Sequence, residues 1–191
     1  MIRKLAPGAR IVLAAAALSV SAFAQEPSLQ RSFGGDTVDL RLSAGNYRVT
    51  ASPDNQIRVT PRTNAAQVST RITVNLLGTR ATVRVVGPKD GFDADIQLPA
   101  RVGVDVELAG GSLRLSGVEG SKDVRADAGN IEIVIGDGTR YRRVTASVRS
   151  GELTASAFDE RARGVQSFEW TGTGPHDLRV RLGQGRLTLK N

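Results

Sequence analysis

The sequence predicts an all-β protein, and two observations carry this prediction. Apolar and polar residues alternate with a period of two along most of the chain, as in Ile57–Thr60 and Ala81–Val86, which is the pattern of half-buried strands. Turn-forming clusters such as Gly87–Gly91 interrupt these runs at intervals of about ten residues. After the N-terminal segment, only Ala157–Gly164 is compatible with a helix, and with one short helix at most.

The first 24 residues have the three parts of an export signal. A basic start, formed by Arg3, Lys4 and Arg10, precedes an apolar stretch that ends in the small residues Ala22-Phe23-Ala24. The stretch is shorter than the roughly 20 apolar residues that span a bilayer. We therefore predict a signal peptide over 1–24 and a periplasmic or secreted mature chain, 25–191, without a transmembrane segment.

Composition narrows the function of this mature chain. It has the length of one domain and enough residues to bury a core. The sequence contains no cysteine, which excludes disulfides, thiolate metal sites and cysteine nucleophiles. Loss of the signal lowers the formal charge from +7 to about +4, with arginines scattered among acidic residues. That is a mildly basic surface, and we expect no nucleic-acid partner.

A ten-residue template recurs five times along the chain. It begins with two apolar residues that are separated by one other residue, and a glycine follows three positions after the second of them. Two more apolar residues lie two and four positions after the glycine. The template predicts two short strands around a glycine turn, with all apolar residues on one face. The glycines of the five copies are Gly45, Gly111, Gly129, Gly151 and Gly185.

The spacing of the copies favours a β-solenoid of stacked coils. Copies two to four follow one another at 18 and 22 residues, which is about the length of one coil. Equivalent residues then form ladders, with Val106 on Val124 on Ala146. The alternative is an antiparallel sandwich or barrel in which each template is a hairpin. The irregular N-terminal part is 25–100, and the repeats lie in 101–191. In a solenoid, the N-terminal part and Phe168–Pro175 would be the caps that cover the open sheet edges.

The chain resembles the bacterial putative-adhesin family that carries a domain of unknown function, DUF4097. The resemblance rests on the strand pair Asp95–Leu108 with its internal Leu-Pro, the coils at Gly111, Gly129 and Gly151, and the terminal Gly185–Leu189. It covers roughly 33–189 and implies a β-solenoid-like fold, but no activity. The chain lacks the membrane-anchoring segment of many members, which favours a free periplasmic or secreted product.

The residues of the common catalytic and metal sites are scarce. His176, beside Asp177, is the only histidine, and no G-x-S-x-G nucleophile elbow occurs. One imidazole does not make a zinc site. The acidic run Asp90, Asp93 and Asp95 lacks the spacing of a calcium loop, so we interpret it as a turn. We expect no catalytic residue, cofactor or metal.

Two groups of polar residues remain as candidates. Arginine forks suit phosphates and carboxylates, and the binding candidates are therefore Arg140, Arg142, Arg143 and Arg149. The second group is an acidic set beside Arg125 that a carbohydrate-cleaving β-helix enzyme would use, namely Asp123, Asp127, Glu132 and Asp137. Phe158, Phe168 and Trp170 are expected to close one end of the core, although aromatic rings also form sugar platforms.

The sequence thus favours a non-enzymatic exported envelope protein. The expected roles are adhesion, scaffolding or binding of an anionic surface polymer, with an envelope polysaccharide or another envelope protein as partner and self-association through exposed strand edges. The alternative is a carbohydrate-active enzyme that acts on an acidic polysaccharide. A groove that gathers two or more carboxylates and a basic residue on adjacent coils would favour the enzyme.

Overall fold

The computed structural model describes residues 28–62, 70–88 and 92–191, and it confirms the all-β prediction. Fourteen strands join one sheet, and the only helix in these residues is a 3₁₀ turn at Gly138–Arg140. The predicted signal peptide lies outside the described residues. The strands are β1 Leu29–Ser32, β2 Thr37–Leu42, β3 Gly45–Ser52, β4 Gln56–Pro61, β5 Arg71–Leu77, β6 Arg80–Val86, β7 Asp93–Pro99, β8 Gly103–Leu108, β9 Gly111–Leu115, β10 Lys122–Val134, β11 Tyr141–Thr154, β12 Arg163–Val165, β13 Ser167–Thr171 and β14 His176–Lys190.

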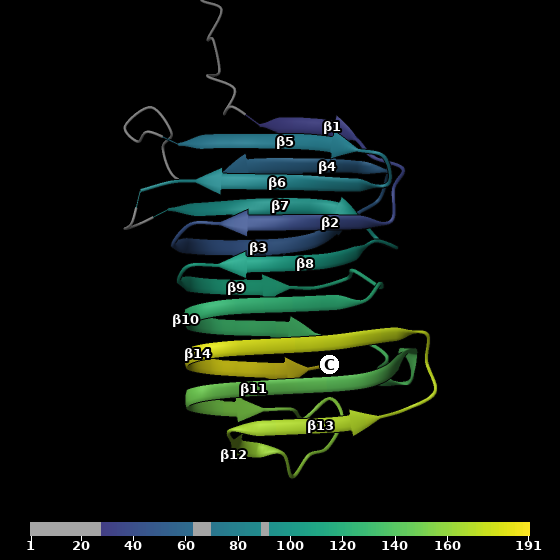
Figure 1. Ribbon diagram of the computed structural model, residues 1–191, viewed down its shortest axis with the longest axis vertical. Helices are drawn as coiled ribbons and strands as arrows, with labels where there is room; N and C mark the ends of the chain where they lie inside the picture. Colours follow the sequence, from purple (N-terminus) through teal and green to yellow (C-terminus); the bar gives the residue numbers. More distant parts are fainter. Residues whose placement is uncertain (1–27, 63–69, 89–91) are drawn as a thin grey trace, which may run out of the picture.

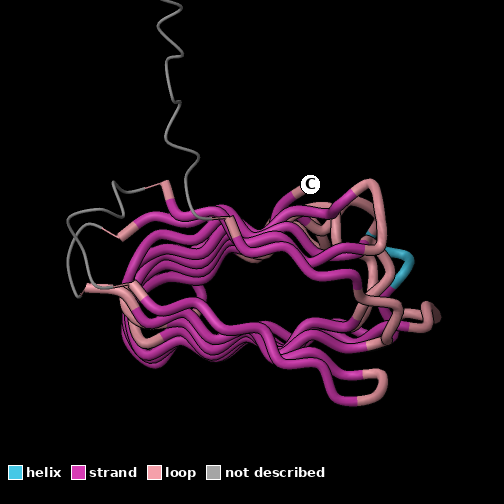
Figure 2. Tube along the Cα trace, turned by 90° about the horizontal axis from the view of Figure 1, so that it is seen from above, coloured by secondary structure: helices cyan, strands magenta, loops and turns pink. Residues whose placement is uncertain are grey.

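The sheet folds round on itself into a flattened, nearly closed barrel (Figure 2), so the barrel part of the alternative prediction fits the cross-section. Two halves face each other across the core. The front half runs β5–β6–β2–β8 and continues through the first parts of β10, β14 and β11 to β13. The back half runs β1–β4–β7–β3–β9 and continues through the second parts of β10, β14 and β11 to β12 (Figure 1).

The template strands pair in parallel and in register. In each of the long strands β10, β14 and β11 the chain passes from the front half to the back half at the template glycine. The two strands of one template therefore lie in opposite halves and pair with other copies, not with each other as a hairpin would require. The pairing of β3, β9, β10, β14 and β11 brings all five template glycines into one column: Gly45, Gly111, Gly129, Gly185 and Gly151.

The order of the copies differs from the order in the sequence. Val124 pairs with Val106, as predicted, but its other neighbour is Val180, and Ala146 pairs with Val180 in turn. The predicted contact of Val124 with Ala146 is therefore wrong. The last strand, β14, inserts between β10 and β11 because the chain leaves β11 through the antiparallel strands β12 and β13 and then returns.

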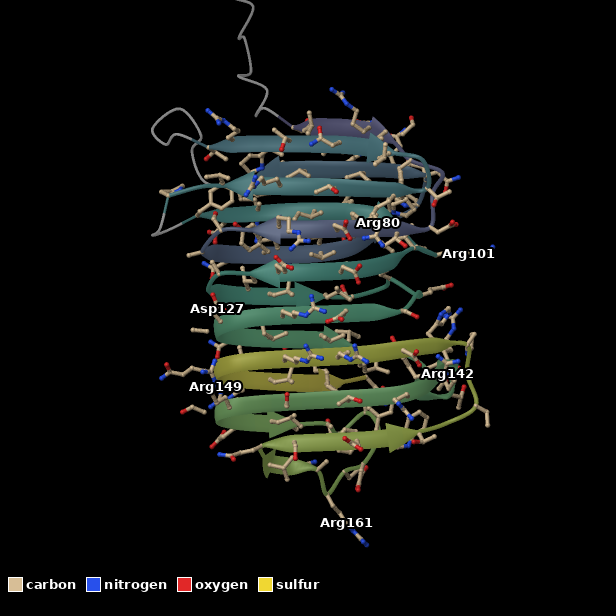
Figure 3. All side chains as sticks on the ribbon, viewed as in Figure 1. Arg80, Arg101, Asp127, Arg142, Arg149 and Arg161 are labelled. Atoms are coloured by element: carbon tan, nitrogen blue, oxygen red, sulfur yellow. The ribbon has the colours of Figure 1, made fainter. Side chains whose placement is uncertain are left out.

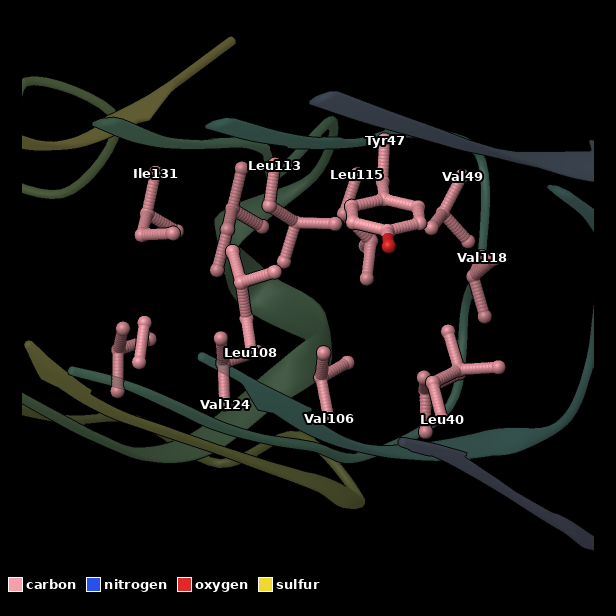
Figure 4. Close-up of a cluster of buried hydrophobic side chains, with 14 of the residues drawn as sticks. Leu40, Tyr47, Val49, Val106, Leu108, Leu113, Leu115, Val118, Val124 and Ile131 are labelled. Atoms are coloured by element: carbon pink, nitrogen blue, oxygen red, sulfur yellow. The ribbon is translucent and has the colours of Figure 1, made fainter. Parts of the chain in front are cut away.

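The interior is filled by side chains from both halves (Figure 4). Front-half residues such as Leu40, Val106 and Val124 face back-half residues such as Leu113 and Ile131, and all of them are buried. The alternation of burial along β8 and β10 is the direct consequence of the period-two pattern in the sequence. The polar positions between them point outward and make the two outer faces.

The end of the barrel near β13 is closed by aromatic rings. Phe158 lies 5.0 Å from Trp170 and 5.9 Å from Tyr141, measured between ring centroids, and packs against the core. This placement agrees with the expected closing role. The segment Ala157–Gly164, for which the sequence allowed at most one short helix, forms turns and the start of β12. The carbonyl of Ala155 accepts from the backbone N–H groups of Phe158 and Asp159, which turns the chain back toward β11.

Candidate anion-binding face

Outward side chains of the front half form rows across the strands, because the strands are in register. One row runs from β6 to β11 through one outward position of each strand. It consists of Arg84, Arg41, Glu107, Arg125, Arg181 and Ser147. Neighbouring strands lie about 4.8 Å apart, so the guanidinium groups follow one another at short intervals along the barrel. We call this set the arginine row.

A groove of about 820 Å³ follows the arginine row on the front face. Arg149 of β11 and Asp127, which lie nearer the glycine bend, complete its charged lining (Figure 3). Five arginines and two acidic residues line the groove, which gives it an excess of three positive charges. Low-dielectric walls around charges of one sign raise the local concentration of oppositely charged ligands.

Three of the five groove arginines have no carboxylate partner. Within the described part of the chain, Arg84, Arg149 and Arg181 form no ion pair, although all three are exposed. The other two are neutralised locally: Arg41 pairs with Glu107, and Arg125 lies 2.7 Å from an oxygen of Asp123. The three unpaired guanidinium groups keep their full hydrogen-bonding capacity for an anionic ligand.

The structure separates the four arginines that the sequence singled out. Arg149 lies in the groove, whereas Arg142 and Arg143 line a second hollow of about 530 Å³ together with Arg80 and Arg179. Arg142 is already bound by Asp177, at 2.6 Å, and this contact lowers the pKa of Asp177. A bulge at the start of β11 exposes both Arg142 and Arg143.

Arg140 lies apart from the other three, at the end of the 3₁₀ turn. It donates to Glu119 at 2.9 Å and thereby lowers the pKa of that carboxyl. The turn itself is fixed by Asp137, whose side chain accepts from the backbone N–H of Thr139 at 2.9 Å. Arg140, Arg142, Arg143 and Arg149 therefore do not form one site.

Sequence reasoning missed the arginine row, although a signal for it was present. Arg41, Arg125 and Arg181 occupy the same polar position of three template copies, one residue before the second apolar position. Superposition of the copies would have placed them in one row. Arg84 lies on β6, which belongs to no copy of the template, and only its pairing with Arg41 brings it into the arginine row.

The four acidic candidates do not come together either. Asp123 points out of the front face, Asp127 lies near the bend, Glu132 is on the back half and Asp137 caps the 3₁₀ turn. The structure instead places Asp123 in a row with two aspartates that the sequence did not single out. We call Asp39, Asp105 and Asp123 the aspartate row.

Charges from several strands meet at the aspartate row. Arg80 donates to both oxygens of the buried Asp39, at 2.9 and 3.1 Å, and lies 3.8 Å from Asp105. Burial, followed by the charge of Asp39 and a hydrogen bond with it, raises the pKa of Asp105. Within the described residues, no group of three or more His, Cys, Asp or Glu side chains is arranged to hold a metal ion.

His176 is half-buried beside Tyr141 at the start of β14. Asp177, its neighbour in the sequence, binds Arg142. Burial and the nearby charges of Lys122 and Arg140 lower the pKa of His176. The pairing of a histidine with an aspartate that general-base catalysis would use is thus replaced by an arginine–aspartate pair.

Comparisons with known proteins define the fold class of this chain. No family model matches the sequence, and no curated protein matches it. A crystal structure described as a putative cell adhesion protein from Clostridium sporogenes has the same fold, with a TM-score of 0.51 at 13% sequence identity over 85% of this chain and 98% of that chain. A putative adhesin from Parabacteroides merdae covers 86% of this chain and 95% of its own, with a TM-score of 0.25 at 7% identity. In the described residues, we find no helix of the length and apolarity needed to span a bilayer.

Proposed function

We propose that the protein is a non-enzymatic, exported envelope protein that binds an anionic surface polymer through the groove along the arginine row. The observation that carries this proposal is the presence of three exposed, unpaired arginines, Arg84, Arg149 and Arg181, in one groove. An extended polymer fits a row whose charges repeat from strand to strand along the barrel. The similarity in fold to the putative cell adhesion protein from Clostridium sporogenes supports the same role.

We also propose that the chain is a stacked-coil solenoid of the DUF4097 type. The parallel, in-register pairing of the template copies and their single glycine column support this description. Such a module offers a long, regular outer face, which suits adhesion or scaffolding in the periplasm or outside the cell.

The binding proposal is tested with polymers that differ in charge. The chain from Gln25 onward is titrated against dextran sulfate and neutral dextran, and against lipopolysaccharide. We expect the variant Arg84→Ser/Arg149→Ser/Arg181→Ser to lose at least about tenfold in affinity for the sulfated polymer, because each charge-assisted hydrogen bond contributes roughly 1.5–3 kcal/mol.

A matched control removes the same charge elsewhere. Arg101→Ser/Arg161→Ser/Arg163→Ser changes three exposed arginines outside the groove and is expected to bind as the wild type does. A third variant, Arg140→Ser/Arg142→Ser/Arg143→Ser, tests the cluster that the sequence singled out. Equal losses in the groove variant and the control would reduce the effect to net charge and overturn the proposed site.

The aspartate row favours a second candidate function, cleavage of an acidic polysaccharide. Asp39 and Asp105 lie side by side on the adjacent strands β2 and β8, and glycosidases use two neighbouring carboxyl groups. The raised pKa of Asp105 is the property of a general acid. Against this role, Arg80 occupies both oxygens of Asp39.

An assay for new reducing ends separates the two functions. An enzyme releases them from a polymer that it binds, and Asp105→Asn abolishes the release while binding persists. If no bound polyanion yields reducing ends, the enzymatic candidate is wrong and the binding proposal is unaffected.

A further inference from the structure

The two ends of the barrel are finished differently, and the end at β5 is left open. β5 is the last strand of the front half and pairs only with β6, so no described residue pairs with its outer edge. A strand edge with free N–H and C=O groups is a template for a further strand. Natural proteins usually protect such edges with charges, prolines or covering segments.

The exposed apolar side chains of the protein gather at this end. Among the described residues, the large hydrophobic side chains that are exposed are Leu76 at 46%, Leu77 at 83% and Val86 at 46%. All three belong to β5 or β6. Leu76 lies on the core side of β5, opposite the buried Ala81, whereas Leu77 and Val86 lie on the outer face, opposite Arg80 and Arg71.

The core-facing residues of β5 show the same incomplete burial. Ile72, Val74 and Leu76 lie opposite Val85, Val83 and Ala81 of β6, which are fully buried or nearly so. Ile72 and Val74 are only partly buried, and Leu76 is exposed. At this end of the barrel, no described residue therefore covers the apolar core.

The opposite end carries the usual protection. Phe158 plugs the core there, and the edge strands β12 and β13 carry Arg163 and Glu169. β5 has a single charge, Arg71, at its first position. Because β12 and β13 are shorter than β5 and the core behind them is covered by Phe158, β5 is the edge better suited to pairing.

We propose that β5 pairs antiparallel with β5 of a second copy of this chain, which joins two barrels end to end. The sequence of β5 is self-complementary when Val74 lies on the twofold axis. Val74 then faces its own copy, Ile72 faces Leu76 of the partner subunit, and Thr73 faces Asn75 of the partner subunit. The apolar side chains continue the core across the interface, and no like charges stand opposite each other.

The same register covers the exposed side chains of the outer face. Arg71 stands opposite Leu77 of the partner subunit, and Val86 is the neighbour of Arg71 on β6. The aliphatic part of Arg71 then lies between two apolar residues while its guanidinium group stays in water. One pairing therefore covers all three exposed side chains, Leu76, Leu77 and Val86.

The register is tested by cross-linking, for which the absence of native cysteine makes the chain well suited. In the chain from Gln25 onward, Val74→Cys places two thiols opposite each other, whereas Thr73→Cys places each thiol opposite an asparagine. Under mild oxidation or with a short bis-maleimide, we expect about tenfold more covalent dimer from Val74→Cys than from Thr73→Cys, since directly opposed pairs are closer than diagonal ones.

Sedimentation measures the assembly without cross-linking. The wild type is expected to shift toward twice the monomer mass as its concentration rises. Leu76→Lys, which puts a charge into the paired edge, is expected to remain monomeric. Ser167→Lys, on the edge strand β13 at the other end, should behave as the wild type does. A wild type that stays monomeric at all concentrations, or equal cross-linking of the two cysteine variants, would overturn the proposal.

Discussion

At the residue scale, Lys122 is a charged side chain at a position where the alternating pattern of the strand predicts an apolar one. Its row holds Val104 and Leu178 on the neighbouring strands, and all three positions face the core. The amino group donates to the carbonyl of Gly120 at 2.8 Å and to the hydroxyl of Tyr141 at 2.7 Å. No carboxylate binds it in the described structure, and burial lowers its pKa from 10.5 to about 8.

This buried charge makes stability depend on pH in a defined direction. Between pH 8 and 10.5 the unfolded chain binds more protons at Lys122 than the folded chain does, so the free energy of unfolding rises with pH in that range. Below pH 8 the charge costs the folded state on the order of 3 kcal/mol. Above pH 10 the raised pKa of Tyr141, about 12, acts in the opposite direction, so the rise is best measured below pH 10.

Lys122→Met is expected to remove this rise and to stabilise the protein at pH 7 by about 1–3 kcal/mol. Denaturant unfolding at several pH values measures both effects. Because Lys122→Met also removes the partner of the Tyr141 hydroxyl, the double variant Lys122→Met/Tyr141→Phe should be at least as stable as Lys122→Met alone. Lys190→Met, at a half-exposed lysine paired with Glu132, is the control. The same pH dependence in wild type and Lys122→Met would show that the buried charge is not its source.

At the element scale, the glycine column explains how three long strands bend together. A Cβ added to Gly129 would lie 1.7 Å from the carbonyl oxygen of Gly111, and Gly129 has a φ of +132°. Gly111, Gly129, Gly151 and Gly185 all combine such a close backbone approach with a positive φ that other residues avoid, whereas Gly45 shows the close approach alone. The template needs glycine for both reasons.

We expect Gly129→Ala to destabilise the fold by more than about 3 kcal/mol, because a backbone clash at the bend has no flexible partner that can move. Thermal and denaturant unfolding measure the loss. Gly136→Ala is a suitable comparison, since Gly136 has a φ of +71° but nothing within 4 Å of an added Cβ. Its cost should be only the roughly 1–2 kcal/mol of the left-handed conformation. Equal effects at the two positions would contradict the role of close packing in the column.

At the scale of the whole molecule, β14 is inserted inside the sheet, between two strands that precede it in the sequence. β14 pairs on one side with β10 and on the other with β11, along both halves of the barrel. Its buried residues, among them Val180 and Leu187, supply one full layer of the core. The later part of the chain therefore cannot complete its sheet until its last strand is in place.

A chain that ends at Pro175 is accordingly expected to lose cooperative unfolding and dispersed amide resonances, because β10 and β11 would each lose a parallel neighbour. Circular dichroism and NMR spectra measure this. Deletion of 25–32, which removes the short and mostly exposed β1, should leave the fold intact. A folded chain without β14 would show that the insertion is dispensable.

The sequence by itself determined the fold class, the strand faces and the five bend positions of this protein. The alternation of apolar and polar residues and the positions of glycines are local properties, which a short stretch of sequence shows without knowledge of its distant contacts. For the same reason, the sequence alone identified template residues such as Val124 and Ile131 as core residues. It also identified Phe158 and Trp170 as residues that close one end of the core.

Only the tertiary structure decided which copy lies beside which, and hence the candidate site. The template is nearly the same in every copy, so its pattern does not distinguish Val180 from Ala146 as the neighbour of Val124. The groove, the aspartate row and the open edge at β5 all arise from this order and from the pairing of β2 with β6. Arg140 and Arg149 are close in sequence, but Arg140 lies in the 3₁₀ turn before β11 and Arg149 lies near the glycine bend of that strand. The extended residues between them separate the two by about 3.3 Å each.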